Sequence, residues 1–337
     1  MTVSIIIPVY QVSAYIERCL LSVMKQDYSD IECIIVNDAT KDDSIIKCEK
    51  LIKNYNGTIR FKIIHHLDNK GISATRNSGT NAATGEYLFY LDSDDDIATD
   101  CIRKLVEPVL KDTAIEMVQG NYIQILDENG ELIDNGGTLN SPMRLSSNDD
   151  VRMYSLDYYT IKVFPWNKLL KRSFLLKHNL YFKEGIIFED QLWRFYLLKY
   201  LKDVYIYNGI TYYYHTRPNS VLTDTQNHKK KGNSFQIIFD EILNHLTVGK
   251  ERQELNGYYD IFFGKYLSFV DDVPSFYDTL RLYRKRAKKY GCFYIYIALT
   301  ILDNFGHSRI PRGVLKRLNK MWMKIRRRKR KKGSLQA

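Results

Sequence analysis

Residues 88–96 read LFYLDSDDD, an apolar segment that runs directly into a cluster of carboxylates. A β-strand places residues i and i+2 on one face, so a strand that reaches this cluster is expected to project Asp92 and Asp94 together from its end. Two convergent carboxylates on a rigid element suit a hard divalent cation, Mg²⁺ or Mn²⁺, that also binds a phosphate. This stretch therefore predicts a metal-assisted phosphate site at the end of a buried strand.

Two other interpretations of this stretch are a calcium loop and a helix cap. An EF-hand loop requires Gly at its sixth position and Glu at its twelfth. Counted from Asp92, these positions hold Ile97 and Arg103, which excludes the calcium loop. A solvated acidic loop that caps the next helix stays open on this segment alone, because Asp and Ser favour the N-cap position.

Residues 1–100 alternate strand and helix patterns, as parallel α/β folds do. Continuous apolar, β-branched runs predict strands that are buried on both faces, and apolar residues three and four apart predict helices between them. The expected strands are 3–9, 31–36, 61–64 and 87–91, and the expected helices are 14–25, 43–53 and 73–83.

Polar residues follow each expected strand, and in open parallel sheets ligands bind outside the carboxyl ends of the strands. These residues are Tyr10 and Gln11, Asn37 and Asp38, His65 and His66 with Asp68, and Asp92 to Asp95. Their recurrence predicts one ligand site along this edge of the sheet. His65 and His66 are interpreted as loop residues and not as a metal pair, because neighbouring residues of a strand point to opposite faces.

The turn after the first strand excludes two common nucleotide folds. Residues 8–13 read PVYQVS and contain no glycine, whereas a dinucleotide-binding turn needs G-x-G-x-x-G, and no P-loop motif occurs in the chain. A phosphate is therefore not expected to lie in a glycine-rich backbone cradle. A metal bound by Asp92 and Asp94 can take over that role.

Seven motifs, taken in order, resemble those of family 2 glycosyltransferases of the GT-A fold. They are SIIIPVY (4–10), VNDATKDDS (36–44), NKGISATRN (69–77), LDSDD (91–95), PWNKL (165–169), FED (188–190) and YYYHTR (212–217). The resemblance covers residues 2–220, and the last three motifs look like those of bacterial polysaccharide enzymes. It implies an α/β GT-A fold with a mostly parallel, Rossmann-like central sheet flanked by helices, followed by a helical C-terminal extension.

The resemblance also implies transfer of a sugar, with inversion at the anomeric carbon, from a nucleotide sugar such as a UDP-sugar in the presence of Mg²⁺ or Mn²⁺. Matched by position, the donor side comprises Pro8, Tyr10 and Asp38 around the base and ribose, Asp92 and Ser93 at the donor sugar, and Arg76 near the diphosphate. Asp94 is the implied metal ligand, with His215 as a second. One departure from the family pattern is Asn37, which stands where an aspartate is common.

On the acceptor side the resemblance implies that Asp190 is the catalytic base. A carboxylate can take the proton of an attacking hydroxyl, and Gly185 allows a tight loop before the helix expected from residue 191 onward. The alternative is that Glu189 and Asp190 only cap that helix. Trp166 and Glu189 are the expected acceptor contacts, although core packing is an equal interpretation for Trp166.

The ends of these patterns predict the domain organisation. The expected parts are a glycosyltransferase domain at 1–220, made of a nucleotide-binding half at 1–100 and an acceptor half at 101–220, a mainly helical region at 221–305 and a basic amphipathic tail at 306–337. Within the acceptor half, Asn129-Gly130 between the apolar runs 117–126 and 132–133 predicts a β-hairpin.

The net charge of +11 is concentrated in the tail. Residues 309–332 contain 13 Lys/Arg and no acid, so the remainder of the chain carries a net charge of −2. Apolar residues such as Leu318 and Trp322 recur at helical spacing apart from the basic ones, which is typical of an in-plane helix on an anionic membrane surface. The two alternatives are a solvated tail and a segment that binds nucleic acid. The amphipathic pattern favours the membrane surface, so no nucleic acid is expected as a partner.

The remaining features concern the compartment. Residues 1–4 lack the basic region of a signal peptide, no apolar run approaches the ~20 residues of a membrane span, and the five cysteines show no C-x-x-C spacing. We therefore expect a cytoplasmic protein, peripheral on the inner face of the cell membrane, that acts on a lipid-linked saccharide in cell-surface polysaccharide synthesis. A nucleotidyltransferase and an inactive sugar-binding module of the same fold stay open as alternatives.

Overall fold

The computed structural model describes residues 1–126, 130–133, 141–156, 160–216, 228–245, 281, 283–285 and 288. The chain divides into two compact units, one of Met1–Val151 with Ile161–Thr223 and one of Arg152–Thr160 with Asp224–Ala337. The first unit contains every candidate site residue. In the second unit the structure describes helix α8 (His228–His245), while the expected tail at 306–337 lies outside the described residues.

A mixed sheet of ten strands organises the described residues of the first unit. Its strands are β1 (Val3–Val9), β2 (Ile31–Asn37), β3 (Arg60–His65), β4 (Tyr87–Tyr90), β5 (Asp96–Ile97), β6 (Met117–Leu126), β7 (Leu132–Ile133), β8 (Met143–Leu145), β9 (Lys168–Lys171) and β10 (Val204–Thr216). The order is β3-β2-β1-β4-β9-β6-β10-β5, with β7 beside β6 and β8 beside β10. β1 is parallel to β2 and β4, β2 to β3, and β6 to β10, whereas β9 is antiparallel to both of its neighbours. The predicted α/β fold is confirmed, and the sheet is parallel over β3-β2-β1-β4 and mixed beyond it, because β5, β7, β8 and β9 pair in antiparallel fashion.

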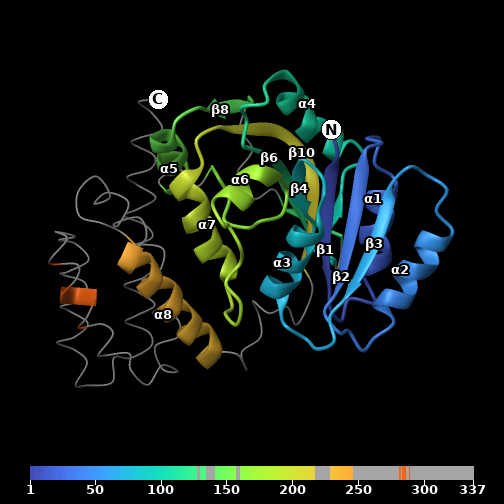
Figure 1. Cartoon of the computed structure of the whole chain (residues 1–337), viewed down its shortest axis with the longest axis horizontal. Helices are drawn as coiled ribbons and strands as arrows, with labels where there is room; N and C mark the ends of the chain where they lie inside the picture. Colours follow the sequence, from blue (N-terminus) through green and yellow to red (C-terminus); the bar gives the residue numbers. More distant parts are fainter. Residues whose placement is uncertain are drawn as a thin grey trace. The chain divides into compact units, whose positions relative to one another are not determined.

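Helices flank this sheet (Figure 1). They are α1 (Ile16–Met24), α2 (Ser44–Lys53), α3 (Ile72–Ala82), α4 (Cys101–Lys111), α5 (Asn148–Leu156), α6 (Arg172–Lys177) and α7 (Glu189–Tyr200). All strands and helices predicted for residues 1–100 are present, and their ends differ from the prediction by at most two residues. The hairpin prediction is also confirmed, because β6 and β7 pair in antiparallel fashion on either side of Gly130.

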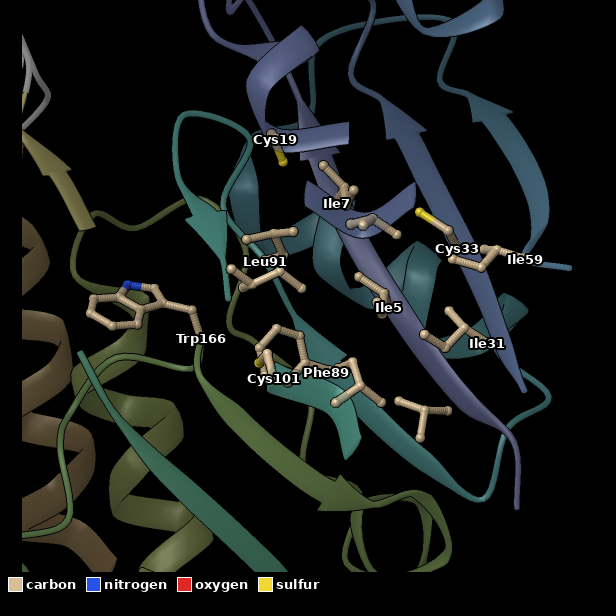
Figure 2. Packing of buried hydrophobic residues seen from close by; sticks show 14 of the residues in the cluster. Ile5, Ile7, Cys19, Ile31, Cys33, Ile59, Phe89, Leu91, Cys101 and Trp166 are labelled. Carbon is tan, nitrogen blue, oxygen red and sulfur yellow. The ribbon is translucent and has the colours of Figure 1, made fainter. Parts of the chain in front are cut away.

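β1 is buried on both faces because its alternate residues pack against different helices. Ile5 and Ile7 lie in the apolar cluster that includes Cys19 of α1 (Figure 2). Ile6 points to the other face, where its side chain lies against Gly79 of α3. The strand is therefore fully covered, which explains why its sequence is a continuous apolar run.

The parallel strands end at one edge of the sheet, and the segments that follow them are joined there. The Gln11 N–H donates to Thr40 Oγ1 at 2.8 Å, which links the segments after β1 and β2. The His66 N–H donates to the Asn37 carbonyl oxygen at 2.9 Å, which links the segments after β2 and β3. The strand-end residues singled out in the sequence thus lie along one edge.

We expect Gly79→Ala to destabilise the protein, although the same change in an exposed helix interior stabilises by about 0.5–1 kcal/mol. A Cβ at this position would overlap Ile6 Cγ2, a buried side-chain atom next to the backbone of β1. Overpacking of this kind typically costs about 1–3 kcal/mol. Urea unfolding followed by circular dichroism measures the change, and a midpoint equal to or above that of the wild type would contradict the close approach of α3 to β1.

Candidate active site

β4 ends at Tyr90, and the acidic residues after it form a turn instead of continuing the strand. The Asp95 N–H donates to the Asp92 carbonyl oxygen at 3.1 Å, which closes the turn. The expectation that Asp92 and Asp94 leave the sheet on one strand face is therefore wrong in its geometry. Asp and Ser favour turns because their side chains offer the backbone alternative hydrogen bonds. We call residues 92–95 the acidic turn.

Asp95 anchors the acidic turn to β10. Its carboxylate is buried and accepts hydrogen bonds from the Tyr212 hydroxyl at 2.6 Å and from the His215 N–H at 2.8 Å. The Tyr212 oxygen also accepts the Asp92 N–H at 3.3 Å. Burial and the negative charges of Asp94 and Asp92 raise the pKa of Asp95 well above its ordinary value. Burial and these neighbouring carboxylates therefore disfavour the charged form of Asp95.

His215 and Arg18 contact the outer side of the acidic turn. The His215 ring is bound through Nε2, which lies 2.6 Å from Asp96 Oδ1. Arg18, on α1, donates from Nη2 to the Asp94 carbonyl oxygen at 2.6 Å, and its Nε lies 3.7 Å from the same Asp96 oxygen. His215, the residue expected as a second metal ligand, thus binds Asp96 through Nε2.

The donor set of the acidic turn fits a divalent cation shared with a substrate. Among the described residues, no group of three or more His, Cys, Asp or Glu side chains is arranged to hold a metal by itself. Mg²⁺ at phosphate sites is usually bound through one or two carboxylates together with the phosphates of the substrate. Asp94 and Asp92, both in the acidic turn, are the carboxylates that could supply such a pair.

Arg76 joins the acidic turn to α7. Its guanidinium is 4% exposed and donates to Asp92 Oδ1 at 2.8 Å and to Glu189 Oε1 at 2.7 Å. Burial acts to lower the pKa of Arg76, but the two carboxylates outweigh burial and raise it above its ordinary value. Arg76, which was expected near the diphosphate, is therefore already paired with two carboxylates that lie far apart in the sequence.

Asp190, the candidate base, lies in the first turn of α7. Phe188, the residue before the helix, has a left-handed backbone conformation with φ of 65°. The chain therefore changes direction just before Glu189. The charge of Asp190 acts on Arg76 and on Lys168 of β9. The structure therefore brings Asp190 within electrostatic reach of the guanidinium that binds the acidic turn.

Lys168, on β9, is fully buried. Its Nζ donates to the Phe164 carbonyl oxygen and lies 4.7 Å from the centre of the Phe164 ring. Burial, together with the charges of Arg194 and Lys162, lowers the pKa of Lys168 well below its ordinary value, and Asp190 acts in the opposite direction. The sequence placed Lys168 in a motif but gave it no role.

On the other side of the site, Asp38 is 2% exposed and its carboxylate is already bound on three sides. It accepts the Lys70 N–H at 2.9 Å, the Gly71 N–H at 2.8 Å and a hydrogen bond from His66 Nδ1 at 2.7 Å. The sequence placed His66 among the polar residues that follow the strands, as a loop residue and not as part of a metal pair, and gave it no partner. In the structure His65 is the last residue of β3, and His66 turns toward Asp38.

The other donor-side residues differ in accessibility. Tyr10 follows β1 and is 41% exposed, so its ring can meet a ligand. Pro8 is buried within β1, opposite Val36 of β2, and Ser93 is buried within the acidic turn. Of these residues, Tyr10 presents the most open side-chain surface.

Trp166 lies in the core and does not present an open face to a sugar. Its ring stacks on Phe164, with centroids 3.4 Å apart, and on Tyr212, with centroids 4.4 Å apart. Only 6% of the residue is exposed, and Figure 2 shows it beside the residues of the apolar cluster. Of the two interpretations of Trp166, the structure favours core packing, because aromatic rings from the preceding loop and from β10 cover it.

Backbone strain is concentrated around the site. Within the described residues, five non-glycine residues have positive φ, and Gln11, Ala39, Asn167 and Phe188 are four of them. Gln11 and Ala39 follow β1 and β2, and Phe188 precedes α7. Such conformations persist where the surroundings over-determine them, which is common at ligand sites.

The fold and the strand-end acidic turn define a GT-A protein. Residues 4–175 match Glycosyl transferase family 2, and the chain belongs to this family. It is 32% identical over 235 residues to the putative glycosyltransferase EpsH of Bacillus subtilis, covering 68% of this chain and 64% of EpsH. It is 30% identical over 267 residues to the uncharacterized glycosyltransferase EpsJ of the same organism, covering 76% and 74%. The chain thus matches less than two thirds of the length of EpsH.

Solved structures share the fold at low sequence identity. Residues 1–349 of S. aureus TarS, in complex with UDP-GlcNAc, align with a TM-score of 0.63 and 19% identity over 91% of this chain and 92% of that chain. The mannosyltransferase PcManGT of Pyrobaculum calidifontis, in complex with GDP-Man and Mn²⁺, aligns with a TM-score of 0.56 and 13% identity over 95% and 84%. The GT-A fold predicted from the sequence is confirmed.

Arg76→Met should lower the free energy of unfolding by about 3 kcal/mol or more, because Asp92 and Glu189 lose the guanidinium that they share in a buried setting. The matched control is Arg103→Met, which removes ion pairs that Arg103 makes at the surface and should change stability little. Chemical denaturation of the two variants makes the comparison. Equal midpoints would mean that the Arg76 bridge does not stabilise the fold.

Proposed function

We propose that this chain transfers a sugar from a UDP-sugar to a saccharide acceptor, with inversion and with Mg²⁺ or Mn²⁺. The observation that carries the proposal is the Arg76 bridge, which joins Asp92 of the acidic turn to Glu189, the neighbour of Asp190. A donor-side carboxylate and an acceptor-side carboxylate are thereby held around one cation. This is the arrangement that transfer between two bound substrates requires.

In the proposed reaction, Asp190 takes the proton of the attacking acceptor hydroxyl. The hydroxyl oxygen bonds to the anomeric carbon while the bond from that carbon to the diphosphate oxygen breaks, and the nucleoside diphosphate leaves with the electron pair. When bound, a divalent ion supplies a Lewis acid that offsets the charge of the leaving group. Asp94, with Asp92, would hold this ion, and Pro8, Tyr10 and Asp38 would line the pocket for the base and ribose.

The donor class is supported by the fold relatives. TarS is solved with UDP-GlcNAc and PcManGT with GDP-Man and Mn²⁺. A nucleotidyltransferase and an inactive sugar-binding module are the competing proposals. The former would release pyrophosphate from a nucleoside triphosphate, and the latter would bind donors without turnover. Product analysis with a UDP-sugar and an acceptor, and separately with a nucleoside triphosphate and a sugar phosphate, separates the three.

Asp190→Asn should lower the transfer rate by about 10²–10⁴-fold, because an amide cannot accept the hydroxyl proton, while donor binding is retained. Asp94→Asn should instead weaken metal-dependent donor binding. The control is Asp149→Asn, an exposed carboxylate on α5. Release of UDP in the presence of acceptor is the assay. Turnover by Asp190→Asn within a factor of about two of the control would contradict the assignment of the base.

We further propose that the acceptor is lipid-linked and that the enzyme works at the cytoplasmic face of the membrane, held there by the basic tail at 306–337 in a pathway for cell-surface polysaccharide. The support is the amphipathic, acid-free sequence of residues 309–332. None of the helices that the structure describes combines the length and apolar character needed to cross a bilayer.

A chain truncated before Arg309 should lose most of its binding to anionic liposomes, because each basic residue near such a surface contributes about 1 kcal/mol. Binding of the full chain should weaken as salt is raised. Sedimentation with phosphatidylglycerol vesicles measures both, and neutral vesicles serve as the control. Equal sedimentation of the truncated chain would contradict a role for the tail.

A further inference from the structure

Away from the acidic turn, three side chains from three elements form a hydrogen-bond chain. His66 follows β3, and its Nδ1 lies 2.7 Å from Asp38 Oδ1. Its Nε2 lies 2.8 Å from the hydroxyl oxygen of Ser78 on α3. The side chains of His66 and Asp38 are 7% and 3% exposed. Neither His66 nor Ser78 is among the residues to which the family resemblance gives a role.

The partners of His66 determine its tautomer. An ionised carboxylate only accepts hydrogen bonds, so Nδ1 carries the proton that it donates to Asp38. In the neutral ring Nε2 then accepts the hydroxyl proton of Ser78. Ser78 thereby orients the ring, and the ring orients the carboxylate.

The remaining contacts of Asp38 limit what it can bind. Oδ1 also accepts the Lys70 N–H, and Oδ2 accepts the Gly71 N–H. A carboxylate has about four acceptor positions, so about one, on Oδ2, is left for a ligand. A ring N–H of a nucleobase fills a single acceptor position. A diphosphate, which offers acceptors and negative charge, does not.

The chain Asp38–His66–Ser78 has the residue types of a hydrolytic triad but lacks its setting. Ser78 lies within α3, where backbone N–H groups are used by the hydrogen bonds of the helix. No pair of N–H groups is therefore available beside its hydroxyl to bind an oxyanion. Orientation of Asp38 is the role that this geometry supports.

We propose that His66 and Ser78 are positioning residues that fix the Asp38 carboxylate so that its last acceptor position receives a ring N–H of the donor base. The proposal rests on the proposed function, because it needs a nucleotide donor. Without His66 the carboxylate loses one of the bonds that fix its rotation, so the contact with the base weakens. The metal and diphosphate contacts at the acidic turn do not involve His66 and stay unchanged.

Isothermal titration of the full chain with UDP and with inorganic pyrophosphate, each in Mn²⁺, tests this proposal. His66→Phe removes both hydrogen bonds of the ring. We expect UDP affinity to fall about tenfold, the loss of one hydrogen bond to a charged group. Pyrophosphate has no base, so its affinity should change less than about twofold.

Two further variants guard against a general loss of structure. Ser78→Ala removes only the outer hydrogen bond, in a helix where Ala is well tolerated, and should weaken UDP binding about two- to tenfold. His66→Asn keeps an N–H donor near the position of Nδ1 and should restore part of the affinity that His66→Phe loses.

Unchanged UDP affinity in both His66→Phe and Ser78→Ala would overturn the proposal. Equal losses for UDP and pyrophosphate would also overturn it, because they would indicate a structural role alone. A wild-type chain that binds neither UDP nor GDP would overturn the proposed function, and this proposal with it. If the wild-type chain binds UDP normally but the variants give either of the first two results, only the positioning role is contradicted and the proposed function stands.

Discussion

The buried ion pairs of Arg76 are the constraint on which the rest of the site depends. The guanidinium bridges Asp92 and Glu189, which reach it from distant parts of the sequence. A buried charge without a partner is costly, so the fold is most stable when the acidic turn and the start of α7 meet at this point. The planar guanidinium can donate to two carboxylates at once, which the compact ammonium of Lys does less well. Because Asp190 follows Glu189 directly, the same interaction places the candidate base.

Helix α3 makes this arrangement possible, because consecutive residues of a helix point about 100° apart. Arg76 contacts Asp92 and Glu189, Asn77 donates to and accepts from the backbone of Phe182, and Ser78 contacts His66. The helix lies close to β1 because Gly79 has no side chain. Its many small and polar residues are therefore explained by what surrounds it. Three adjacent residues of α3 thus contact the segment after β3, the acidic turn and the start of α7, and the chain before α7.

Periodicity predicted the strands and helices of residues 1–100 because those patterns are local. It failed at the acidic turn because the i, i+2 rule holds only while the chain stays extended, and the turn is anchored by Tyr212 on β10, more than a hundred residues later. The same limit applies to Trp166 and His66, whose surroundings are set by contacts with other strands and helices. The contact between Arg76 and Glu189 was not predicted from the sequence. No local pattern relates an arginine in one helix to a glutamate at the start of another.

The charged groups around the acidic turn affect how a metal ion and a diphosphate would bind there. Asp92 and Asp94 to Asp96 bring four carboxyl groups to the end of β4, where the guanidinium groups of Arg18 and Arg76 contact this segment. Arg76 is shared with Glu189. Under the proposed function, a diphosphate that approached these carboxylates alone would be repelled. A divalent ion held by Asp94 with Asp92 would offset that repulsion, so the ion and the diphosphate would each raise the affinity of the site for the other, by the same free energy.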